Sequence, residues 1–185
     1  MVSREVPIST RRYEAYSHEA LKAEVETDND PSAVGEIGFE WAELAGQFAD
    51  HAEVIKTAAQ SSEQSWQGAG GDAMRASVLS MAAWSHQAAE ASVNMANSMA
   101  KHSAIAARAK HDMPEPVEYD PAGLIRSTVQ SGNIFALCAL PGVLWANRAA
   151  SEAAKQKAVD VMNARDAGFH TAVVTEGFPQ PRQGS

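Results

Sequence analysis

Residues that could do chemistry are present in this sequence, but their types and spacing do not form a reactive set. No cysteine or carboxylate is spaced with the histidines in the way that metal ligands are. No nucleophile–base arrangement stands out, nor does a pair of carboxylates on one helical face. The histidines considered as ligands are His51, His86, His102 and His111. We therefore expect no enzymatic activity, no metal site and no cofactor.

The stretch SSEQSWQGAGGDAM, residues 61–74, indicates recognition rather than catalysis. Each of Gly68, Gly70 and Gly71 costs a helix about 1 kcal/mol relative to alanine, so the chain is expected to turn here. These glycines do not follow a strand and lack the Lys-Ser/Thr that completes a phosphate-binding loop. Trp66, beside this turn, either plugs the core of a hairpin or is recognised by another molecule. We favour recognition.

The elements that position Trp66 are predicted to be helices. Hydrophobic residues make up 45% of the 185 residues, but much of this is alanine and only 6% is aromatic. Alanine favours helix, and the alternating runs typical of strands are almost missing, so the fold class is predicted to be all-α. A net charge of −8 gives no electrostatic basis for binding nucleic acid or an anionic membrane.

Two long segments with helical periodicity flank the turn. Apolar and small residues follow spacings of three and four from Ile37 to Ser65, and again from Met74 to Ala109. A stripe of alanines runs beside the bulkier stripe on each segment. The second helix would span about 40 residues, or roughly 60 Å. We expect an elongated antiparallel helical hairpin with its tip at residues 66–71, accompanied by shorter helices.

The chain divides into three parts by composition. Residues 1–30 are predicted to be a leader with a short helix, residues 31–168 a helical domain, and residues 169–185 a flexible tail. The N-terminal MVSREVPIST has no apolar core of a secretory signal peptide, so export would use another route.

Shorter helices are predicted after the proline-rich residues 113–121. We expect one helix over about 121–139 and a last one over about 143–167, joined by a turn at residues 140–142 and stopped at Gly168.

The longest apolar run is IFALCALPGVLWA, residues 134–146. It is too short to span a bilayer and contains Pro141 and Gly142, so no stable membrane insertion is expected. Cys138, the single cysteine, lies inside this run and is predicted to be a packed hydrophobic side chain.

Each long helix carries more apolar surface than a two-helix hairpin can bury, and the short helices could cover only part of it. Because soluble monomers seldom expose such a surface, we expect a second helical hairpin to dock here and complete a four-helix bundle. We call the residues assigned to this contact the partner seam: Ile37, Trp41, Leu44, Phe48, Ile55, Met74, Val78, Met81, Met95 and Met99.

Several motifs in order along residues 31–168 resemble the PPE branch of the WXG100/type VII secretion (ESX) substrate superfamily of actinobacteria. The Pro-Pro-Glu tripeptide that names this branch is missing. The matching motifs are Trp66-Gln67-Gly68, Trp41-Ala42-Glu43-Leu44-Ala45, Met74, Ala83-Trp84-Ser85, Ala107-Arg108-Ala109, Met113-Pro114-Glu115-Pro116 and Asn133-Ile134-Phe135.

The resemblance implies a PPE-like helical bundle that pairs with a small PE-like two-helix protein. Trp66 and Gly68 would form an export motif beside a Y-x-x-x-D/E signal on the partner, and no tyrosine here is followed four residues later by Asp or Glu. The resemblance also implies an apolar tip between the fourth and fifth helices, covered by an EspG-like cytosolic chaperone. The residues assigned to this tip are Phe135, Leu137, Leu140, Val143 and Leu144.

The protein would be cytoplasmic before export and then secreted or displayed at the cell surface by the secretion ATPase machinery. Two alternatives stay open. The chain could be a helical structural protein that assembles with copies of itself, or the N-terminal targeting domain of a secreted toxin.

Overall fold

The computed structural model describes residues 10–27, 29–172 and 178–180, and within these ranges the fold is all-α with no strand, as predicted. The elements in chain order are the 3-10 turn η1 (Tyr13–Ala15) and the helices α1 (His18–Glu26), α2 (Pro31–Ser61), α3 (Ala69–Asp112), α4 (Pro121–Ser131) and α5 (Ile134–Thr171).

The described residues form two compact units. Unit 1 contains residues 30–104, 170–172 and 178–180, and unit 2 contains residues 10–27, 29 and 105–169.

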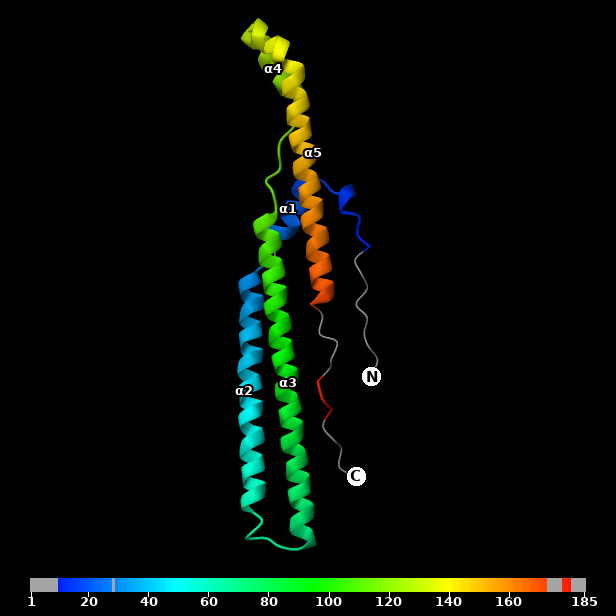
Figure 1. Cartoon of the computed structure of the whole chain (residues 1–185). Coiled ribbons are helices and arrows are strands. Elements are labelled where there is room, and N and C mark those ends of the chain that lie inside the picture. The colour runs from blue at the N-terminus through cyan, green and yellow to red at the C-terminus, as the bar shows by residue number, and fades with distance from the viewer. Residues whose placement is uncertain (1–9, 28, 173–177, 181–185) are drawn as a thin grey trace. The chain divides into compact units, whose positions relative to one another are not determined.

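The main feature of unit 1 is an antiparallel hairpin of α2 and α3 (Figure 1). Asp30 caps the start of α2, because its Oδ1 accepts hydrogen bonds from the backbone N–H groups of Ser32 (2.9 Å) and Ala33 (3.2 Å). Pro31 occupies the first turn, where its missing N–H costs nothing.

The two helices of the hairpin meet along small side chains. The buried residues of α2 are Gly38, Ala45, Ala52 and Ala59, which recur every seven residues. Facing residues of α3 are also small, and the buried ones include Ala82, Ser85, Ala89 and Ser92. A Cβ on Gly38 would lie 3.2 Å from the Met99 Cβ and 3.3 Å from the Ala96 carbonyl oxygen. The alanine stripe therefore makes the contact within the hairpin.

Unit 2 has a hydrophobic core of its own, to which the N-terminal segment contributes. Tyr13, Leu21 and Val25 are almost fully buried, and the apolar spacing of α1 directs Leu21 and Val25 to one face of that helix. The buried residues of the cluster are Tyr13, Leu21, Val25, Ala109, Ala158, Val159 and Met162.

A charged network fixes Tyr13 in this core. The Tyr13 hydroxyl donates to Asp166 Oδ2 at 2.5 Å, and Arg165 Nη2 lies 2.9 Å from Glu24 Oε1 and 3.1 Å from Asp166 Oδ1. Burial raises the pKa of Tyr13, and the hydrogen bond to Asp166 raises it further. Burial lowers the pKa of Arg165, but the bonds to Glu24 and Asp166 outweigh this and raise it overall.

The turn between the last two helices lies earlier than predicted. α4 ends at Ser131 and α5 begins at Ile134, so the predicted turn at residues 140–142 is wrong, and Pro141 lies inside α5. Gly132 adopts φ 63°, which glycine tolerates, and Asn133 Oδ1 accepts from the backbone N–H groups of Phe135 and Ala136. Leu140, Pro141 and Gly142 offer no capping side chain of this kind.

The predicted helix stop at Gly168 is also wrong, because α5 continues to Thr171. A Cβ at Gly168 would lie 3.2 Å from three carbon atoms of Ile105. This glycine thus permits a close approach of α5 to α3 in unit 2, and it does not end the helix.

Candidate functional site

The tip of the α2–α3 hairpin presents Trp66 to solvent. Its side chain is 50% exposed, and it lies in the turn between Ser61, the last residue of α2, and Ala69, the first of α3. The backbone N–H of Trp66 donates to the Ser62 carbonyl at 3.0 Å, which continues the helical bonding of α2 into the turn. The backbone of Trp66 is therefore held in the turn, and the half-exposed indole is not sealed in the hairpin core.

Two of the three glycines are required by the shape of this turn. Gly68 has φ 96°, a conformation that side chains rarely permit. Gly71 is buried, and a Cβ there would lie 2.5 Å from the carbonyl oxygen of Trp66. A Cβ added at Gly70 would meet nothing within 4 Å, so no contact demands glycine there. The sequence predicted the turn but did not show which of the three glycines the backbone geometry requires.

Arg75 fixes the backbone of the tip from α3. Its Nη1 donates to the Trp66 carbonyl oxygen at 2.7 Å, and its Nη2 forms an ion pair with Asp72 in the first turn of the same helix. Asp72 also suits the positive end of the α3 dipole. The tip offers a half-exposed indole on a turn whose backbone is held by Arg75, which fits recognition by another protein.

The partner seam is only partly free in unit 1. Ile37 and Met81 are exposed, at 45% and 59%. The other eight seam residues are partly buried: Trp41, Leu44, Phe48, Ile55, Met74, Val78, Met95 and Met99. Four further large side chains, which were not predicted from the sequence, are exposed on the same two helices: Phe39, Val54, Leu79 and Val93.

Part of the seam is covered by the chain itself, through residues 178 and 179 of the predicted tail. The ring of Phe178 lies 5.9 Å from that of Trp41 and 6.4 Å from that of Phe48. The Trp84 indole N–H donates to the carbonyl oxygen of Pro179 at 3.1 Å. Residues 173–177 and 181–185 of the predicted tail lie outside the described residues.

The predicted chaperone tip corresponds to the first part of α5 in unit 2. Phe135, Leu137 and Val143 are exposed, Phe135 at 87%, while Leu140 and Leu144 are partly buried. Four more apolar residues, outside the five named for this tip, are exposed on α4 and α5: Ile125, Val129, Ile134 and Trp145. We call the exposed members on α5 the α5 patch: Ile134, Phe135, Leu137, Val143 and Trp145.

One expectation about this apolar run is wrong: Cys138 is exposed and not packed. Because α5 continues through Pro141, it is also long and apolar enough to cross a membrane by length and composition alone: one 18-residue window reaches a mean hydropathy of 1.3, with none of it buried. The Arg148–Glu152 ion pair, at 2.8 Å, lies on the same helix a few residues after Trp145.

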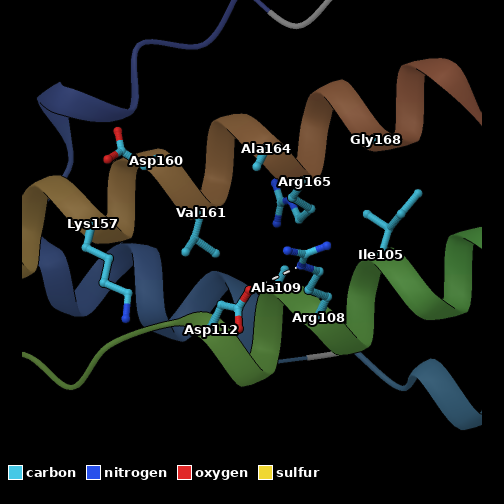
Figure 2. A pocket seen from close by; sticks show the side chains of 10 residues that line it. All are labelled: Ile105, Arg108, Ala109, Asp112, Lys157, Asp160, Val161, Ala164, Arg165 and Gly168. Atoms are coloured by element: carbon cyan, nitrogen blue, oxygen red, sulfur yellow. Dashed lines mark hydrogen bonds and ion pairs between the residues drawn. The ribbon is translucent and has the colours of Figure 1, made fainter.

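A surface groove of about 490 Å³ lies between α3 and α5 in unit 2. Figure 2 shows Ile105 from α3 and Val161 from α5 extending into the space between the helices. Charged residues also line the groove around Ile105 and Val161. They include the Arg108–Asp112 ion pair, at 3.3 Å. The ten residues that line the groove include no histidine, cysteine, serine or threonine.

No protein-family model matches the chain, and no curated protein matches it either. Across the described residues, no group of three or more His, Cys, Asp or Glu side chains could hold a metal ion. The exposed apolar features of the described residues are the hairpin tip, parts of the partner seam and the α5 patch.

Proposed function

We propose that this chain is a PPE-like subunit of type VII secretion that acts by binding and not by catalysis. It pairs with a small PE-like two-helix protein along the partner seam, and Trp66 and Gly68 serve as its export motif. An EspG-like chaperone covers the α5 patch in the cytoplasm before the secretion ATPase machinery exports the pair.

The single observation that carries this proposal is the half-exposed indole of Trp66 on a turn with a fixed backbone. A tryptophan that only filled the hairpin core would lose most of its exposure. Instead, Gly68, Gly71 and Arg75 constrain the backbone around an indole that stays available to a partner.

Exposed apolar surface on α2, α3 and α5 supports the need for protein partners. Large exposed patches on soluble proteins mark interaction sites. For the α5 patch, a protein cover is favoured over a lipid one, because the charged Arg148–Glu152 pair follows within two turns of Trp145.

The test compares Trp66→Ala with the matched control Gln67→Ala in an actinobacterial host that has a type VII system. The chain is co-expressed with a candidate two-helix partner encoded beside it. We expect Trp66→Ala to abolish appearance of the chain in the culture filtrate while co-purification with the partner persists, and Gln67→Ala to leave both unchanged. Normal export of Trp66→Ala would refute the assignment of the export motif.

Light scattering on the purified lone chain tests the pairing part separately. A discrete homo-oligomer formed without a partner would favour the alternative, a self-assembling structural protein, because the exposed surfaces of α2 and α3 would then be occupied by copies of the same chain.

A further inference from the structure

The aromatic part of the partner seam already holds a ligand in unit 1. Phe178 packs between Trp41 and Phe48 with ring centroids 5.9 and 6.4 Å away and the ring planes tilted by 47° and 56°. Phe48 in turn meets Trp84 edge-on, at 5.9 Å and 90°. These separations lie within the range in which aromatic rings attract each other.

A hydrogen bond adds direction to this aromatic contact. The Trp84 indole donates to the Pro179 carbonyl oxygen at 3.1 Å, and an indole N–H that is partly buried needs such an acceptor. Proline has a fixed φ and no N–H, so it presents its carbonyl without a competing donor. Aromatic-lined grooves also bind proline-containing segments in other proteins.

A second anchor holds the chain on α3 just before this contact. Ser98, which is 4% exposed, donates its hydroxyl hydrogen bond to the Ala172 carbonyl oxygen at 2.7 Å. The ligand is thus delivered from a tethered point in the same unit, which raises its effective concentration at the aromatic site.

We propose that Trp41, Phe48 and Trp84 form a binding site for an extended Phe-Pro segment, and that Phe178–Pro179 is its resident, displaceable ligand. Trp41 and Phe48 of this site belong to the partner seam. If the proposed pairing is correct, the partner must therefore release this segment as it docks.

We expect the contact between the Phe178–Pro179 segment and the aromatic site to be weak enough for the segment to dissociate. Phe178 remains 38% exposed, and within residues 178–180, which the structure describes, the contacts with the site are the partly buried Phe178 ring and the hydrogen bond to Pro179. A separate peptide of this kind would bind with a Kd on the order of 0.1–1 mM. Tethering at an effective concentration of about 1 mM then keeps the site roughly 50–90% occupied, and release lowers the apparent affinity of a competing partner by roughly two- to tenfold.

The first experiment follows the indole N–H signals of the full-length, ¹⁵N-labelled chain by NMR, with the Trp84 signal assigned from a Trp84→Phe variant. We expect Phe178→Ala to shift the Trp84 signal and to speed its exchange with water. The control Gln180→Ala, two residues away and exposed, should leave that signal in place. An unchanged Trp84 signal in Phe178→Ala would overturn the proposal.

The second experiment adds a synthetic peptide of residues 176–185 to the full-length Phe178→Ala chain. The peptide should return the Trp84 signal toward its original position with a Kd on the order of 0.1–1 mM, whereas the same peptide with Ala in place of Phe should not. Absence of any shift at ten times that concentration would also overturn the proposal.

Both experiments use the chain alone, so they succeed or fail independently of the pairing proposal. Release is tested by adding the co-purifying partner to the labelled chain. If the partner binds while the Trp84 signal keeps its original position, the partner and the Phe-Pro segment use different surfaces, and the release step is wrong although pairing is correct.

Discussion

Replacing Gly71 by alanine is the sharpest test of how the hairpin tip is built. The new Cβ would lie 2.5 Å from the Trp66 carbonyl oxygen and 3.2 Å from its carbon, so one of the two must move. The carbonyl oxygen is also held by Arg75 Nη1 at 2.7 Å, and its displacement would strain that bond. Overpacking of this kind costs about 1–3 kcal/mol.

Gly70→Ala is the matched control, because it lies one residue earlier in the same helical turn with nothing within 4 Å of the added Cβ. Both variants gain the helix propensity of alanine, up to about 1 kcal/mol. The difference between them therefore isolates the steric cost, and we expect Gly71→Ala to be less stable than Gly70→Ala by about 1–3 kcal/mol.

Urea unfolding of the full chain, followed by far-UV circular dichroism, measures this difference. Trp66→Phe in each background keeps the backbone contact and tests whether the indole itself contributes. Equal free energies of unfolding for Gly71→Ala and Gly70→Ala, within about 0.5 kcal/mol, would refute the close approach of Gly71 to Trp66.

Two further predictions concern the cores of the two units. Because the folded state raises the pKa of Tyr13, stability is fully present below the ordinary tyrosine pKa of about 10 and falls as the pH rises past it. Tyr13→Phe should reduce this alkaline loss and lower the free energy of unfolding at neutral pH by about 1–3 kcal/mol, as measured by urea titrations on either side of pH ~10; an alkaline loss as large as that of the unsubstituted chain would contradict it. In unit 1, Ala45→Leu should cost about 1–3 kcal/mol because Ala45 is 5% exposed in the hairpin contact, whereas exposed Ala42→Leu should change stability by less than about 0.5 kcal/mol. Similar urea midpoints for these two variants would contradict the small-residue packing.

The long helices could be predicted because their signal is local and repeated. Apolar spacings of three and four over dozens of residues predicted α2 and α3, and the glycines at 68–71 predicted the turn between them. The position of Trp66 at this turn followed directly. What spacing alone left open was which stripe faces the neighbouring helix, since the bulky and the alanine stripes lie side by side.

The two wrong helix boundaries arose where a local sequence rule for ending a helix was overridden by other contacts in the structure. Proline and glycine at 141–142 suggested a helix break. The chain instead turns earlier, because Gly132 caps the end of α4 and Asn133 caps the start of α5. Gly168 was expected to end a helix, yet its missing side chain makes room for Ile105.

The contact of Phe178 with the partner seam could not be predicted from local pattern, because it joins residues more than 90 positions apart. One signal was available in hindsight: Phe178 is a large aromatic beside Pro179 in an otherwise polar, proline-containing segment. Burial of such an aromatic ring is favourable, but the sequence does not indicate which residues the ring packs against.

The alanine stripe of the hairpin repeats so regularly that it cannot by itself align the two helices. Sliding α2 by seven residues, about 10 Å along its axis, would again set one small side chain against another. The alignment must come from contacts that occur once, such as Gly38 opposite Met99 and Phe48 against Trp84. The uniqueness of this hairpin thus depends on a few irregular pairs, while the repeated alanines only let the backbones come close.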